Sequence, residues 1–197
     1  MRKSYLLLAT FLLPVIAVAQ QSTVSDIQGW ILSHLGGTWA ARSLDQQGRP
    51  VTSTSVVTLS FTNCNVSMNQ DMSITMTYDA ISPQREVVLT THDHYISNFS
   101  LANAEPGKVA VVQAPSRPGY TDPHAWISME LRAPISVYST TEVGTLGGFV
   151  RPDVSRAFQT NGVMINFSDL ALAQRQANAW RDLITACGGK DISDKLY

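Results

Sequence analysis

The chain has 197 residues, of which 44% are hydrophobic and 15% are charged, with 14 lysines and arginines against 15 aspartates and glutamates. This length suits one domain, and the apolar content is enough to bury a core. Because the basic residues are scattered and balanced by acids, the composition gives no support to a nucleic-acid or membrane-surface role.

The first 19 residues have the organisation of a secretory signal peptide. Arg2 and Lys3 precede the apolar run YLLLATFLLPVIAV, and small residues follow it at the cleavage spacing. This run is too short for a comfortable membrane span, and no later segment approaches the roughly 20 apolar residues that a span needs. We therefore expect a periplasmic or secreted protein with one domain over residues 20–189 and a short tail over residues 190–197.

After the signal peptide, the spacing of the apolar residues predicts a helix. Val24, Ile27, Trp30, Ile31 and Leu35 fall on one helical face, and a Gly-Gly pair follows them. The polar stretch AARSLDQQGRP that comes next is typical of a loop.

Between residues 51 and 167 apolar and polar residues alternate, which predicts antiparallel strands with one packed face. In the segment SVVTLSFTNCNVSM the apolar phase shifts by one near Thr62 and Asn63, so we expect a bulge or a sharp bend there. Further strands are expected in DMSITMTYDA and at residues 87–90, 109–112, 125–132, 135–139 and 163–167.

The closing segment SDLALAQRQANAWRDLITACGG predicts a second helix, which Ser168 or Asp169 can cap. Its apolar stripe consists of Leu170, Ala173, Ala177, Trp180, Ile184 and Cys187. Together these elements predict an α+β fold: a bent antiparallel sheet, partial barrel or roll of about seven strands, with an N-terminal helix and a C-terminal helix packed on the sheet.

The chain has two cysteines, Cys64 and Cys187. An oxidising compartment favours their pairing, and the bond would join the end of the second helix to the strand that carries Cys64. The alternative is two separately buried thiols, which behave as small hydrophobic side chains.

The segment HDH places His92 and His94 two residues apart in a chain with four histidines. On a strand this spacing puts both imidazoles on one face, and His124 or Asp122 could supply a third ligand, as in open zinc sites. This pattern makes a periplasmic metal-dependent hydrolase one alternative function.

Two observations speak against that metal site. Continuing the inward phase of the strand would bury Asp93, so we expect the strand to end near Thr91 and the histidines to lie in a loop. No third ligand stands at short range, and we therefore expect no metal or other cofactor.

Two aromatic residues, Trp126 and Tyr138, project from the expected outer face of the sheet. If both are exposed, they form a possible recognition surface. The alternative is that a loop or the first helix partly covers them.

The strand FTNCNV and the closing helix AQRQANAWRDLITACGG resemble those of a loose group of secreted or periplasmic bacterial proteins without an assigned activity. The order of strands followed by one packing helix is also similar to the roll of pleckstrin-homology-like domains. These resemblances imply an architecture, and they carry no catalytic residues to this chain.

No catalytic set assembles from these motifs. We therefore expect an exported, non-catalytic binding or interaction module whose partner is a protein or a small-molecule ligand. The metal-dependent hydrolase using His92, His94 and His124 is one alternative, and an inhibitor or immunity-type protein is another.

Overall fold

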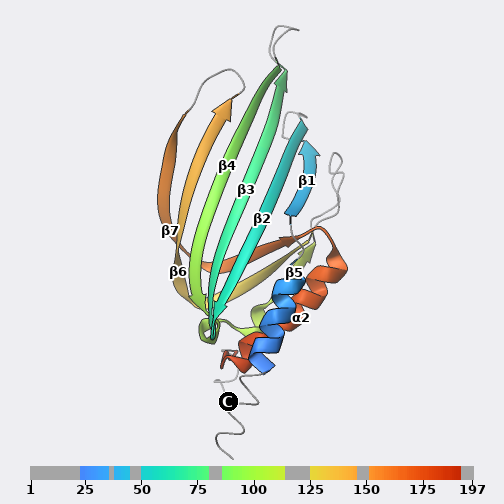
Figure 1. Ribbon diagram of the computed structural model, residues 1–197, viewed down its shortest axis with the longest axis vertical. Coiled ribbons are helices and arrows are strands. Elements are labelled where there is room, and N and C mark those ends of the chain that lie inside the picture. Colours follow the sequence, from blue (N-terminus) through green and yellow to red (C-terminus); the bar gives the residue numbers. More distant parts are fainter. Residues whose placement is uncertain are drawn as a thin grey trace, which may run out of the picture.

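The computed structural model describes residues 23–35, 38–44, 50–79, 86–113, 125–145 and 151–191. In this part of the chain an antiparallel sheet bends around two helices that pack against one of its ends (Figure 1). The α+β fold that the sequence predicts is therefore confirmed.

Seven strands form the sheet in the order β1-β2-β3-β4-β6-β5, and β7 pairs with β6. They are β1 (Thr38–Leu44), β2 (Pro50–Thr62), β3 (Asn65–Asp79), β4 (Glu86–Ser100), β5 (Ala110–Gln113), β6 (Ala125–Thr145) and β7 (Arg151–Phe167). One helix covers residues 23–33, and α2 covers Leu170–Ala186. Two short 3-10 turns, η1 (Leu101–Asn103) and η2 (Pro106–Lys108), lead from β4 into β5. No helix in these described ranges is long and apolar enough to cross a membrane.

The phase shift near Thr62 marks the end of a strand. Thr62 pairs with Asn65, and the two residues between them make a tight turn in which Asn63 has a φ of 54°. Asparagine tolerates this left-handed conformation better than most residues. The sharp bend is thus a hairpin between β2 and β3, and the apolar phase changes because the chain reverses.

The predicted loop in AARSLDQQGRP is wrong over its first part. There β1 pairs with β2 from Thr38 opposite Val56 to Leu44 opposite Pro50. β1 is a short edge strand, and backbone pairing with a long neighbour stabilises it without any apolar alternation of its own.

The strands predicted at 125–132 and 135–139 are two parts of the single strand β6. Its register with β7 shifts between Glu130 and Ile135, a stretch that contains Pro134. Before the shift β6 pairs with β5, and after it with β4, whereas β7 accompanies both parts. The β6–β7 pair therefore turns across the lower end of the sheet, as Figure 1 shows.

The core lies at the end of the sheet that the helices cover. Trp180 of α2 and Ile31 of the first helix are fully buried, and the Phe61 and Trp180 rings have centroids 5.8 Å apart. The side-chain Nε2 of Gln176 donates to the backbone oxygen of Ile31 at 3.1 Å, which joins the two helices inside the core. The apolar stripes predicted for both helices face this core.

Both ends of α2 are capped by local hydrogen bonds. The Asp169 carboxylate accepts from the backbone N–H of Ala171 at 2.8 Å. At the other end the N–H of Gly188 donates to Thr185 and that of Gly189 to Ile184, which is a Schellman motif. Gly188 takes the left-handed conformation that this motif needs, with a φ of 82°.

Cys64 and Cys187 form the expected disulfide, with 5.6 Å between their Cα atoms. It joins the β2–β3 turn to the end of α2. The same turn accepts a hydrogen bond from Gln28 Nε2 to the Asn63 oxygen and another from the Leu101 N–H to the Cys64 oxygen. The end of α2, the first helix and η1 thus all contact this turn.

We expect the Cys64→Ser/Cys187→Ser double variant to lose up to about 5 kcal/mol of unfolding free energy, since the bond closes a 123-residue loop in the unfolded chain. Urea denaturation with and without reductant measures this loss. Reductant should destabilise the native protein and leave the variant unchanged, and equal midpoints for the two proteins in the absence of reductant would contradict the prediction.

Two glycine substitutions should have opposite effects on stability. A Cβ on Gly189 would lie 2.3 Å from Ile184 Cγ2 and 2.7 Å from the Ala104 oxygen, so Gly189→Ala should destabilise by about 1–3 kcal/mol. Gly29 is an exposed helical residue with open space around it, and Gly29→Ala should stabilise by about 0.5–1 kcal/mol. Thermal unfolding of both variants checks the two signs, and a shift of the same sign in both would refute this account.

Candidate functional site

The segment HDH lies inside β4, so the prediction that this strand ends near Thr91 is wrong. Asp93 faces the concave side of the sheet, where its Oδ1 accepts a hydrogen bond from Thr141 Oγ1 at 2.6 Å. That bond compensates the partial burial of a carboxylate, which is why the strand can continue through it.

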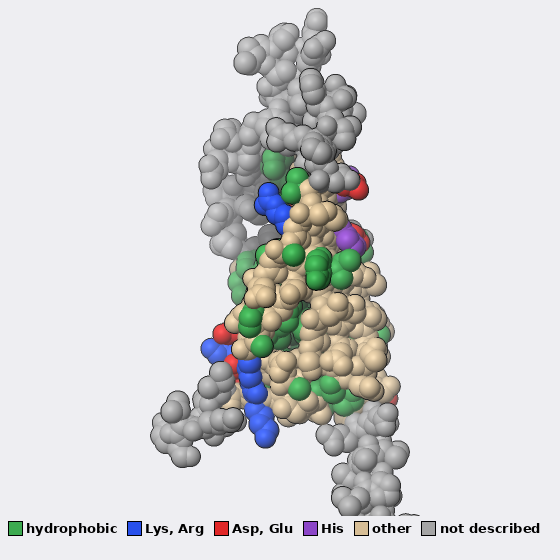
Figure 2. Space-filling model, turned by 90° about the vertical axis from the view of Figure 1, so that its left-hand side faces the viewer, with side chains coloured by type: hydrophobic (Ala, Val, Ile, Leu, Met, Phe, Trp, Pro, Cys, Tyr) green, Lys and Arg blue, Asp and Glu red, His purple; other side chains and the backbone are tan. Residues whose placement is uncertain are grey.

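His92 and His94 therefore share the outer face of the sheet, next to acidic side chains. His94 Nδ1 pairs with the Asp71 carboxylate, and His92 stands opposite Glu142 in the register. His94 is partly exposed and the other three groups are exposed, so such pairs contribute little to stability. Figure 2 shows histidine and acidic side chains side by side on this part of the surface.

No group of three or more His, Cys, Asp or Glu in the described ranges could hold a metal ion. His124 and Asp122, the other two candidate ligands, lie outside the described residues. The metal site using His92, His94 and either of them therefore stays an alternative hypothesis.

Trp126 and Tyr138 both lie on β6, on either side of its register shift. Tyr138 is 60% exposed and stands opposite Ile96 and Ala157, whereas Trp126 is half-buried and stands opposite Val112 and Asn166. Because they have no cross-strand neighbour in common, the two rings do not form one aromatic pair. A recognition surface at Tyr138 stays a prediction.

A partly enclosed arrangement of side chains lies on the concave side of the sheet, above the core. There a cavity of about 330 Å³, which we call the inner cavity, opens between β3, β4 and the bent β6–β7 pair. It is lined by Met68, Gln70, Met72, Tyr95, Ser97, Ile135, Val137, Phe158, Thr160, Gly162, Val163, Met164 and Asn166.

The floor of the inner cavity is the upper layer of the core, because Met68 and Val163 belong to both. From this floor the lining rises along β3 and β4, where Met68 stands opposite Ser97 and Gln70 opposite Tyr95. The alternation of the two strands thus delivers every second residue to the cavity wall.

The rim of the inner cavity on the β7 side is apolar and exposed. Phe158 and Met164, which are 45% and 58% exposed, both line it. Figure 2 looks at this side and shows hydrophobic side chains between polar ones. Large exposed apolar side chains at the mouth of a cavity are a feature of binding sites.

Several polar groups line the inner cavity among the apolar ones. Gln70 Nε2 donates to Ser55 Oγ at 3.1 Å, so this amide is held in place. Burial raises the pKa of the Tyr95 phenol, and the negative charge of Asp93 raises it further. Tyr95 therefore presents a neutral hydroxyl at physiological pH.

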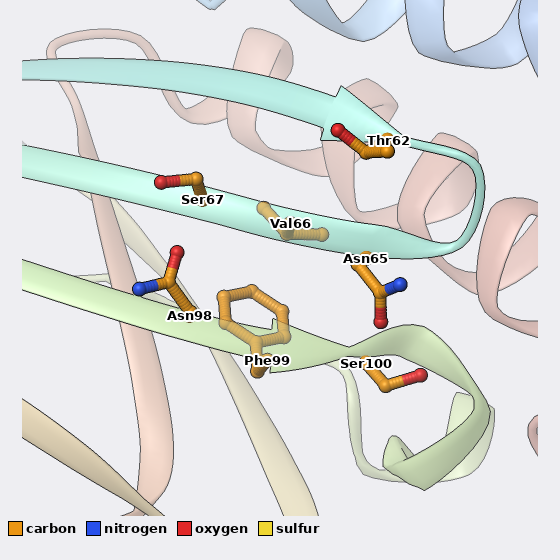
Figure 3. Close-up of a pocket in the computed structure, with 7 residues that line it drawn as sticks. All are labelled: Thr62, Asn65, Val66, Ser67, Asn98, Phe99 and Ser100. Atoms are coloured by element: carbon orange, nitrogen blue, oxygen red, sulfur yellow. The ribbon is translucent and has the colours of Figure 1, made fainter.

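A second hollow, of about 340 Å³, lies at the β2–β3 turn (Figure 3). Val66 and Phe99 contribute to it but are almost completely buried, and its other members are polar: Thr62, Asn65, Ser67, Asn98 and Ser100. Figure 3 shows these polar groups spread along neighbouring strands. Because Thr62, Asn65 and Asn98 are solvent-exposed, water competes for their hydrogen bonds, and the inner cavity is the better candidate site.

Comparisons with protein-family models, with curated proteins and with solved structures find no significant match to this chain. The resemblance to exported bacterial proteins and to pleckstrin-homology-like rolls therefore stays a prediction.

The cavity residues on β3 and β4 are not among the predicted site residues, although the sequence contains a signal for two of them. Gln70 follows the inward phase of Met68 and Met72, and Ser97 precedes the buried Phe99 by two residues. Polar side chains at inward positions mark either a satisfied core residue or a binding site, and only the packing of the helices decides between them.

We expect Asp93→Asn to lower the pKa of the Tyr95 phenol, because one of the two causes of its rise is the Asp93 charge. The value should stay above the ordinary value of about 10, since burial is the larger cause. NMR titration of protein with 13C-labelled tyrosine rings measures this shift from about pH 9 upward. An unchanged or increased pKa would show that Asp93 does not act on this phenol.

Proposed function

We propose that this protein is an exported, non-catalytic module that binds a small, mostly apolar molecule in the inner cavity. The observation that carries the proposal is a cavity with mainly apolar walls above a core that the two helices already complete. Its volume of about 330 Å³ falls at the lower end of the range, roughly 300–1,000 Å³, that is typical of ligand pockets.

The chemistry of the lining supports binding. Among its described residues, hydroxyl, amide and thioether groups provide polarity, and none is a His, Cys, Asp, Glu, Lys or Arg. Such groups orient a ligand, whereas acid–base catalysis relies most often on His, Asp, Glu or Lys side chains, and none of these is among the described lining residues.

Export is supported by two independent features of the chain. The first 19 residues have the organisation of a signal peptide, and the Cys64–Cys187 disulfide suits an oxidising compartment. The proposed ligand is therefore a molecule that the protein meets outside the cytoplasm.

A neutral fluorescent probe, N-phenyl-1-naphthylamine, tests the proposed function. It should bind to the disulfide-bonded protein with one-to-one stoichiometry and become more fluorescent as it enters apolar surroundings. Val137→Phe enlarges a buried lining residue, and Gly162→Trp adds a side chain where a Cβ meets only Thr160 Oγ1, at 3.8 Å. Each variant should weaken probe binding by at least about tenfold, equivalent to ~1.4 kcal/mol.

The matched control is Ala157→Trp, which adds the same large side chain at an exposed position of β7 opposite Tyr138. It should leave probe affinity unchanged. A native protein that does not bind the probe, or filled variants that bind it as well as the native protein does, would refute the proposed function. Far-UV circular dichroism confirms that each variant is folded, and either filled variant suffices for the test.

A further inference from the structure

We propose that the ligand of the inner cavity is a neutral, compact molecule with one hydroxyl- or carbonyl-type group, and that this group forms a hydrogen bond with Ser97. This inference rests on the proposed function and specifies the chemical class of the ligand. It comes from the placement of polar groups in the cavity and from the charges around it.

Ser97 is the residue that points to a polar group on the ligand. Its side chain lines the inner cavity and is 2% exposed, yet its Oγ has no hydrogen-bond partner in the described part of the chain. A buried hydroxyl without a partner costs free energy, and a ligand atom that bonds with it removes this cost. A serine hydroxyl both donates and accepts, so it suits either an alcohol or a carbonyl oxygen.

Three polar residues of the lining lie on β3 and β4, and two more, Thr160 and Asn166, lie on β7. Ser97 and Tyr95 are neighbours on the inner face of β4, and Gln70 of β3 stands opposite Tyr95. Ile135, Val137 and Phe158 of β6 and β7 offer apolar surface, and Val137 is the cross-strand neighbour of Ser97. A molecule with a polar group beside an apolar body suits this lining, with the polar group at Ser97, whose buried hydroxyl is without a partner in the described part of the chain.

The charges around the inner cavity favour a neutral ligand. The described lining holds no cation that could neutralise a carboxylate or phosphate, and Asp93, the next inward residue after Tyr95 on β4, would repel an anion. The Asp93 carboxylate is itself occupied by the Thr141 hydroxyl. Removing an ion from water without such compensation is costly, so an uncharged molecule binds better.

The size of the cavity limits the size of the ligand. An apolar cavity of about 150 Å³ holds benzene, and the inner cavity has roughly twice that volume. Three lining residues are methionines, whose flexible side chains adapt to different shapes: Met68, Met72 and Met164. A two-ring molecule or a short branched chain fits these dimensions.

Four matched probes with one two-ring body test this inference: naphthalene, 2-naphthol, the anion 2-naphthoate and the cation 2-naphthylmethylamine. Their affinities are measured by displacement of N-phenyl-1-naphthylamine and confirmed by calorimetry. 2-Naphthol should bind about 3- to 10-fold better than naphthalene, the range expected for one net hydrogen bond. Both ions should bind less well than 2-naphthol.

Ser97→Ala should abolish the advantage of 2-naphthol over naphthalene and leave naphthalene affinity unchanged. The matched control is Ser139→Ala, which removes another buried hydroxyl from the inner face of the sheet but outside the cavity lining. This variant should keep the preference of the native protein for 2-naphthol.

The possible results separate this inference from the proposed function. If naphthalene displaces the probe but 2-naphthol binds no better, or if Ser97→Ala keeps the preference, the role of Ser97 is refuted and the proposed function stands. If either ion binds best, the neutral class is wrong. If neither the probe nor any of the four compounds binds, the proposed function fails and this inference fails with it.

Discussion

The structure depends on a difference in length between its strands and its helices. A strand of 15 residues such as β3 extends over about 50 Å, whereas the 17 residues of α2 span about 26 Å. Two helices at one end of such a sheet can bury only part of its concave face. The buried part is the core around Trp180, and the adjoining part becomes the inner cavity.

The bend of β6 and β7 encloses the part of the concave face that the helices do not cover, and this forms the inner cavity. Without the register shift between Glu130 and Ile135, the β6–β7 pair would continue the sheet as a further part of its curved wall. Because the pair turns, its lower part closes the core against α2 while Phe158 and Met164 reach the rim of the cavity. One local irregularity thus serves both packing and site formation.

Much of the fold could be predicted from the sequence, because its helices and strands follow simple periodicities. The stripes around Ile31 and Trp180 and the pairing of Cys64 with Cys187 are in the structure as expected. The strand through Asp93 was missed because a hydrogen bond from another strand, from Thr141, compensates its burial, and local pattern contains no information on that partner. The candidate site was missed for a related reason, since a cavity depends on which surface the helices fail to cover.

The disulfide between Cys64 and Cys187 lies where the β2–β3 turn meets the end of α2. This end of the molecule is on the side of the core opposite to the inner cavity. The disulfide therefore resists separation of the helices from the sheet and places no crosslink on the strands that form the cavity walls. Segments with few buried contacts open locally at lower free energy than the whole domain unfolds. Exchange of the proposed ligand by local opening of these strands would therefore not require the disulfide-linked end of the molecule to unfold.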